Sequence, residues 1–156
     1  MADAASLREL YRRTVLEHSR DPHRFGRLEA ADQSATGHNP LCGDKCTVYL
    51  RINDNSITDI SFDGAGCAIC MASASIMTDA VHGQHLEQAQ TAAAKVLDAF
   101  DRDHQAADEE SLHGDMAALG AVRGFPTRIR CATLPWKTLQ ASLAGLPTTV
   151  TTETSH

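Results

Sequence analysis

Residues 46–52 read Cys-Thr-Val-Tyr-Leu-Arg-Ile, and residues 57–62 read Ile-Thr-Asp-Ile-Ser-Phe. In the first stretch, Thr, Tyr and Arg alternate with small or apolar side chains, which is the period of a half-buried β-strand. In the second stretch Ile60 and Phe62 share one face. The Asn-Asp-Asn run at 53–55 is made of residues that favour turns. The two stretches are therefore predicted to form an antiparallel hairpin.

Predicted helices lie on both sides of this hairpin. Residues 6–9 (Ser-Leu-Arg-Glu) form a capping box that opens a helix, and the Asp-Pro pair at 21–22 ends it. Residues 23–39 have no clean period and are expected to be extended or in a loop. After the hairpin, the Ala-rich residues 68–81 predict a helix that stops at Gly83.

The second half of the chain predicts three more helices. An apolar stripe indicates a helix over 85–100, and a short helix is expected over 116–122. The last helix is expected to follow the Phe-Pro pair at 125–126, to have Cys131 at its entry and to end near residue 145. Pro135 fits this helix only if it lies in the first turn.

Two segments are expected to lack regular structure. The acidic residues 101–115 predict a solvated excursion, and residues 148–156 predict a disordered tail. Residues 1–147 are then expected to form a single domain, since a chain of 156 residues is long enough to bury one core.

Composition limits the partners and the compartment. Lys and Arg number 14 against 20 Asp and Glu, so the net charge is −6, which is unsuited to binding nucleic acid or an anionic membrane. No apolar run approaches the roughly 20 residues that span a bilayer, and no signal peptide is recognised. We therefore expect a cytoplasmic protein. In that reducing compartment, five cysteines indicate metal binding or chemistry rather than a disulfide framework.

Three cysteine patches are the candidate site. In the first, Cys42 and Asp44 flank a glycine that permits a bend between them. Cys67 lies between a predicted strand and a helix start, where backbone N–H groups favour a thiolate. If Cys131 joins them, three sulfurs and one carboxylate suit zinc in a tetrahedral site. The same set suits an iron–sulfur cluster, and ligand type does not separate the two.

Other interpretations of these residues remain open. Cys67 and Cys70 form a C-x-x-C pair that suits redox chemistry, unless Cys70 is simply a small core residue. Cys46 is expected to be a buried thiol, although it is close enough in sequence to join the site. The glycine pair at 64 and 66 lacks the third glycine and the parallel strands of a dinucleotide fingerprint. The eight histidines are dispersed and are expected to be surface residues rather than ligands.

The three patches together resemble a known family. Residues 39–44 (Asn-Pro-Leu-Cys-Gly-Asp), residues 64–75 and residues 125–134 are similar to the U-type iron–sulfur cluster assembly proteins, which include the N-terminal domain of NifU. Arg130 stands where the scaffold branch (IscU-like) carries a histidine, so the Arg-Ile-Arg-Cys run is more similar to the SufU-type, zinc-binding branch. That branch also has an insertion where the acidic segment lies.

The resemblance implies an α+β fold, with a small three-stranded antiparallel sheet packed against several helices. It implies zinc as the metal, with the ligands Cys42, Asp44, Cys67 and Cys131. It further implies that a pyridoxal-phosphate-dependent cysteine desulfurase, SufS-like, delivers sulfur to Cys42 as a persulfide. The chain would then act as a sulfurtransferase-like acceptor that serves downstream cluster-assembly proteins of the SUF system.

Two points stay open beside the resemblance. The alternative function is that of a scaffold on which an iron–sulfur cluster is transiently assembled. Arg128 precedes Cys131 by three residues and is expected either to stabilise negative charge at the site, to contact the partner, or to be an ordinary surface residue.

Overall fold

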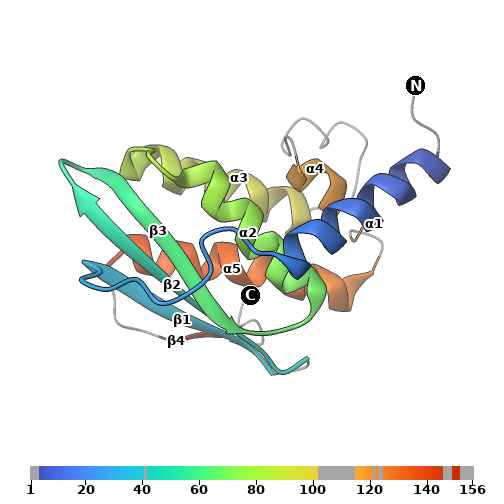
Figure 1. Cartoon of the computed structure of the whole chain (residues 1–156), viewed down its shortest axis with the longest axis horizontal. Coiled ribbons are helices and arrows are strands. Elements are labelled where there is room, and N and C mark those ends of the chain that lie inside the picture. Colours follow the sequence, from blue (N-terminus) through green and yellow to red (C-terminus); the bar gives the residue numbers. More distant parts are fainter. Residues whose placement is uncertain are drawn as a thin grey trace.

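A small antiparallel sheet forms one layer of the molecule, and helices form the other (Figure 1). The computed structural model describes residues 4–40, 42–101, 115–120, 122, 125–145 and 149–151. The predicted hairpin is the pair β2 (Asp44–Asn53) and β3 (Ser56–Ala65), in which Val48 lies opposite Phe62. Cys46, Val48 and Leu50 are buried along one face of β2, as their alternation predicted.

The third strand of the sheet comes from the segment that had no clean period. β1 (Gln33–Asn39) pairs antiparallel with β2, so residues 33–39 are a strand rather than a loop. Its sequence, Gln-Ser-Ala-Thr-Gly-His-Asn, holds a single β-branched residue and no aromatic residue, so its own propensity is weak. Pairing with the strongly patterned β2 decides its conformation. The expected three-stranded antiparallel sheet of an α+β fold is thus present.

A short fourth strand extends this sheet. β4 (Thr149–Thr151) pairs parallel with β1, which makes the strand order β3-β2-β1-β4. The expectation of a disordered tail from 148 to 156 is therefore wrong for these three residues, because backbone pairing at the sheet edge orders them. The remainder of that tail, and residues 102–114 of the acidic segment, lie outside the described residues.

Five helices are present in the described part of the chain. They are α1 (Ala4–Arg20), α2 (Ala68–Val81), α3 (Leu86–Asp101), α4 (Asp115–Leu119) and α5 (Pro126–Leu143). The bounds of α2 are those predicted, and α1 ends just before the Asp-Pro pair. In the described residues, no helix is both long enough and apolar enough to cross a bilayer.

Helix α5 differs most from its prediction. It begins at Pro126, so Cys131 lies in its second turn rather than at its entry, and Pro135 lies in its interior rather than in its first turn. Proline lacks the N–H that would bond to the carbonyl four residues back, which is the carbonyl of Cys131. Leu134 and Trp136 on either side of Pro135 are fully buried, and this packing holds the helix in spite of the missing bond.

Close contact between α5 and the sheet depends on Gly37 of β1. A Cβ atom built at Gly37 would clash with Oγ1 of Thr138 and would lie 2.9 Å from Cδ1 of Leu134. Both contacts are shorter than any normal Cβ contact, so only glycine permits this approach. The helix that carries Cys131 is thereby placed directly on the strand that leads to Cys42.

Candidate metal centre

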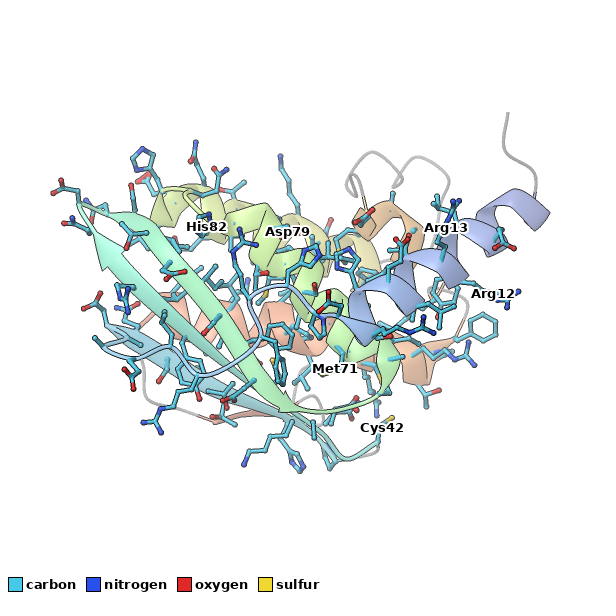
Figure 2. The ribbon with its side chains drawn as sticks, in the orientation of Figure 1. Arg12, Arg13, Cys42, Met71, Asp79 and His82 are labelled. Carbon is cyan, nitrogen blue, oxygen red and sulfur yellow. The ribbon has the colours of Figure 1, made fainter. Side chains whose placement is uncertain are left out.

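The first cysteine patch is the turn that joins β1 to β2. Asn39 pairs with Asp44 across the turn, and the N–H groups of Cys42 and Gly43 donate to the Asn39 carbonyl at 3.3 and 2.8 Å. Gly43 has φ +74°, the left-handed conformation that glycine adopts without strain. The bend turns Cys42 outward, where its side chain is exposed, while Asp44 is 1% exposed. In Figure 2 Cys42 lies at the edge of the molecule.

The second patch meets the first at the start of α2. Cys67 is the N-cap residue of this helix and has an extended backbone, at the junction of strand and helix that the sequence predicted. Its N–H donates to Oδ1 of Asp44 at 2.9 Å, and its sulfur lies 4.0 Å from Oδ2 of the same carboxylate. Asp44 therefore joins the two patches.

The third patch completes the group. Cys131 is 3% exposed, and its sulfur lies 3.7 Å from the sulfur of Cys42. Donor atoms of Cys42, Asp44 and Cys131 all lie within 4.8 Å of one another, and Cys67 is outside this group of three. Three of the four predicted ligand residues thus form one group, and Cys67 adjoins it through its contacts with Asp44.

The spacing of the donors fits zinc. Two sulfurs each about 2.3 Å from a tetrahedral zinc ion lie about 3.8 Å apart. The Cys42–Cys131 sulfur separation is 3.7 Å. Thiolates with one carboxylate are also a chemically suitable donor set for this ion.

The thiols of the site differ in their protonation. A hydrogen bond from the Cys131 thiol lowers the pKa of Cys67 to about 6, with help from the N–H groups of Cys70 and Ile69, while burial and the charge of Asp44 oppose the shift. The pKa of Cys131 is raised by its hydrogen bond to Cys67 and by burial. The two opposite shifts favour the thiolate at Cys67 over the thiolate at Cys131.

Cys46 and Cys70 are core residues. Both side chains are buried, and burial raises the pKa of Cys46 to about 12 and the pKa of Cys70 still further. Neither belongs to a group of three potential metal ligands in the described part of the chain. A fully protonated, buried Cys70 counts against a redox pair with Cys67, because the thiolate is the reactive form.

Arg128 lies on the exposed first turn of α5, one turn before Cys131. Its guanidinium carbon is 5.0 Å from the centroid of the exposed Phe125 ring. The pKa of Tyr11 on α1 is raised, mainly because the residue is partly buried. The neighbouring Arg128 opposes this shift, and the charges of Cys67 and Cys131 add to it. Arg128 is therefore an exposed residue near Tyr11, one turn before Cys131.

One residue of the site had no role in the sequence analysis. Asn39 is 0% exposed, and its side-chain nitrogen lies 3.4 Å from Oδ2 of Asp44 and 3.8 Å from the sulfur of Cys131. Its place at the start of the Asn-Pro-Leu-Cys-Gly-Asp motif was the only signal for it, since nothing in residue spacing points to a contact with Cys131.

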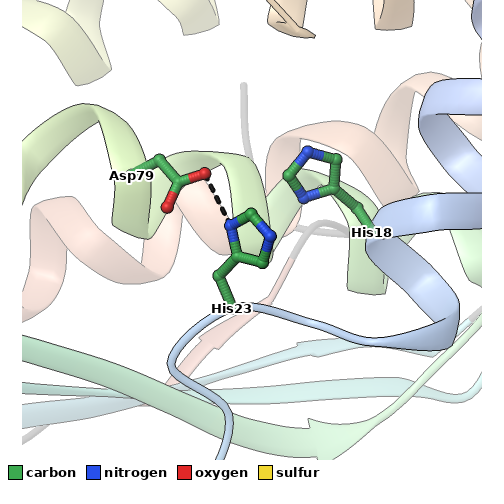
Figure 3. Close-up of side chains that lie close together, drawn as sticks. All are labelled: His18, His23 and Asp79. Carbon is green, nitrogen blue, oxygen red and sulfur yellow. Dashed lines mark hydrogen bonds and ion pairs between the residues drawn. The ribbon is translucent and has the colours of Figure 1, made fainter.

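A second group of ionisable residues lies away from the cysteines (Figure 3). His18 is buried, contrary to the surface position expected for the histidines, and bonds to Ser75 at 2.7 Å and to Asp115 at 2.8 Å. His23 bonds to Asp79 at 2.7 Å, and the other oxygen of Asp79 accepts from Arg24. Because both nitrogens of His18 have partners and Arg24 already neutralises Asp79, this group is best explained as a link between helices.

Comparisons with known proteins show the family of the chain. A family model described as NifU-like N terminal domain matches residues 10–132. The chain is 37% identical over 145 residues to the zinc-dependent sulfurtransferase SufU of Bacillus subtilis (strain 168), covering 92% of this chain and 96% of that protein. It is 35% identical over 139 residues to the iron–sulfur cluster assembly scaffold protein IscU of Streptococcus pyogenes serotype M1, covering 89% and 86%.

Solved structures share the fold. A SUF-system protein from Fervidobacterium islandicum AW-1, described as a candidate iron–sulfur cluster assembly scaffold, superposes with a TM-score of 0.76 at 28% identity, covering 86% of this chain and 97% of that one. The N-terminal part of a NifU-like protein from Brucella abortus gives a TM-score of 0.77 at 26% identity, covering 88% and 94%.

Proposed function

Because the chain belongs to the family of NifU-like N-terminal domains, we propose that it serves iron–sulfur cluster assembly as a zinc-dependent acceptor of persulfide sulfur. The observation that carries the proposal is the grouping of Cys42, Cys131 and the buried Asp44, with Cys67 beside the same carboxylate. Cys42, Asp44, Cys67 and Cys131 would hold the ion. The zinc-dependent relative at 37% identity supports the choice of metal.

Exposure of the four residues supports different roles for them. Asp44 and Cys131 are buried, whereas Cys67 is exposed but forms the N-cap of α2. Cys42 is exposed on a turn whose next residue is the left-handed Gly43. Cys42 is therefore the ligand that can leave the group with the least disturbance of the fold.

The transfer step is a thiol–persulfide exchange. The Cys42 thiolate attacks the outer sulfur of a persulfide carried by the cysteine of a pyridoxal-phosphate-dependent desulfurase. A sulfur–sulfur bond forms at Cys42, the bond in the partner's persulfide breaks, and the partner's cysteine leaves as a thiolate. Bound zinc would keep the sulfur ligands deprotonated at neutral pH. Arg128 lies where it can face the negative charge of the incoming persulfide or the partner's surface.

Replacement of Cys42 tests the proposal. The Cys42→Ala variant should no longer stimulate the desulfurase, measured as sulfide released from cysteine in the presence of a reductant. Cys46→Ala is the matched control, because it removes a buried thiol outside the ligand group and should leave stimulation intact. Undiminished stimulation by Cys42→Ala would refute the proposed role.

A scaffold for a transient iron–sulfur cluster is the second candidate function. It is favoured by the same three converging thiols and by the relative named as a scaffold protein at 35% identity. Anaerobic reconstitution with iron and sulfide, followed by visible absorption and metal analysis, separates the two. A zinc ion that iron does not displace would eliminate the scaffold role.

A further inference from the structure

Asn39 is a fully buried polar residue that contacts two of the proposed ligands at once. Its amide nitrogen donates to Oδ2 of Asp44 at 3.4 Å and to the sulfur of Cys131 at 3.8 Å. Both are within the range of such contacts, and the second is an N–H···S bond, which is longer than one to oxygen. Among the described residues, Asn39 is the one buried side-chain amide that contacts two of the proposed ligands.

These contacts affect the two ligands in chemically different ways. An N–H donor fixes the orientation of the Asp44 carboxylate, as outer-shell partners of metal ligands commonly do. A donor to a thiolate sulfur stabilises its negative charge, and so makes Cys131 a poorer nucleophile and a more firmly held ligand.

The other two cysteines of the site, Cys67 and Cys42, have different neighbours. Cys67 is supported by the N–H groups of Ile69 and Cys70 at the start of α2. The sulfur of Cys42 is contacted by the Cys131 thiol. Cys42 and Cys67 are both exposed, but Cys42 lies on a turn, whereas Cys67 is held at the start of a helix.

We propose that Asn39 is a positioning residue that fixes which ligands stay and which one leaves. It anchors Asp44 and Cys131, so that Cys42 is the thiolate released to accept sulfur. This inference rests on the proposed function and adds to it a residue that selects the reactive cysteine.

The side chain can be tested separately from the backbone of the same residue. The carbonyl of Asn39 shapes the turn by accepting from Cys42 and Gly43, and a substitution leaves that carbonyl in place. Asn39→Ala removes the donor, and Asn39→Leu removes it while filling the space. Thr138→Ala is the matched control, since Thr138 is equally buried on α5 but bonds only locally, to the carbonyl of Leu134.

A double-mutant cycle on zinc affinity provides the decisive readout. Zinc dissociation constants are measured by competition with a chromophoric chelator, using the full chain, and folding is checked by circular dichroism. Asn39→Ala should weaken zinc binding by about 10- to 100-fold, the usual effect of losing an outer-shell partner. Thr138→Ala should not weaken it.

The cycle also distinguishes anchoring from general destabilisation. In a Cys42→Ala background the effect of Asn39→Ala should persist in full, and in a Cys131→Ala or an Asp44→Ala background it should be reduced, because one of the two contacts of Asn39 is already lost. The inference is overturned if Asn39→Ala leaves zinc affinity unchanged, or if its effect is reduced equally in the Cys42→Ala background. If Asn39→Ala does not fold, Asn39→Leu is measured in the same cycle. Failure of the wild-type chain to bind zinc or to stimulate a desulfurase would instead overturn the proposed function.

Discussion

The sulfur of Cys131 lies 3.7 Å from the sulfur of Cys42, although the two residues are 89 positions apart in the sequence. The first stands on a helix packed against the sheet, and the second on a turn of that sheet. Their separation is close to that of two thiolates on one zinc ion. The site is therefore a product of the tertiary fold, and changes in packing should affect it.

Removal of zinc should lower thermal stability. A ligand present at 1,000 times its dissociation constant stabilises the folded state by about 4 kcal/mol. For a chain of this length that corresponds to a fall in Tm of roughly 10 °C when the ion is removed. Differential scanning calorimetry with and without a strong chelator measures the shift. Cys131→Ala should show little shift on chelation, and an unchanged wild-type Tm would contradict a site that is tied into the fold.

The thiolate character of Cys67 should be measurable as a pH dependence. In the metal-free protein its pKa is lowered to about 6, so the reactive thiolate predominates above that pH and is lost as the pH falls through it. The rate of alkylation at Cys67, followed by peptide mass spectrometry, should rise to a plateau with a midpoint near pH 6. The buried Cys46, with a pKa raised to about 12, should stay unmodified over this range. If the midpoint for Cys67 instead lies near the pKa of an unperturbed thiol, then neither Cys131 nor the N–H groups at the start of α2 lower the pKa of Cys67.

The buried His18 should stabilise the fold without contributing to the metal centre. His18→Ala breaks bonds to Ser75 and Asp115 and leaves a buried hydroxyl without this partner. We expect the free energy of unfolding to fall by about 2 kcal/mol in urea denaturation of the zinc-loaded protein. Zinc affinity should be unchanged. His82→Ala, at an exposed position, should change stability by less than about 0.5 kcal/mol; an equal effect of both variants would contradict the linking role of His18.

Gly37 should be sensitive to any side chain. Gly37→Ala places a methyl group against Thr138 and Leu134, so α5 has to shift away from β1. Overpacking of this kind costs about 1–3 kcal/mol. Because Cys131 moves with α5, zinc affinity should fall as well. Adding Thr138→Ala should restore part of the lost stability and part of the lost zinc affinity. If Gly37→Ala alone keeps wild-type stability and zinc affinity, then α5 does not pack this closely on Gly37 in solution.

Sequence periodicity predicted the elements with strong local patterns and failed where tertiary contacts decide. The predictions of the hairpin and of α2 are confirmed, because strand alternation marks the hairpin clearly and a glycine marks the end of the helix. β1 was missed because residues 33–39 carry almost no strand propensity, and their pairing with β2 is a long-range contact. Pro135 was misplaced because packing around α5 outweighs the loss of one backbone bond.

The site was partly predictable for similar reasons. The four candidate ligands could be chosen from the sequence because they are cysteines and an aspartate. The position of Cys67 at the start of α2 was predictable because a strand precedes it and a helical pattern follows it. Convergence of three patches was an expectation from family resemblance, because spacing alone does not determine which elements meet. Asn39 was not singled out, since its role depends on a contact with Cys131 from another part of the chain.

The most direct test of the central claim is to locate the transferred sulfur. The zinc-loaded chain is incubated with a pyridoxal-phosphate-dependent cysteine desulfurase and cysteine, trapped with an alkylating reagent, digested and analysed by mass spectrometry. Our account predicts one added sulfur atom on the peptide that contains Cys42, and none on those that contain Cys67 or Cys131. Added sulfur on either of those cysteines, with Cys42 unmodified, would contradict it.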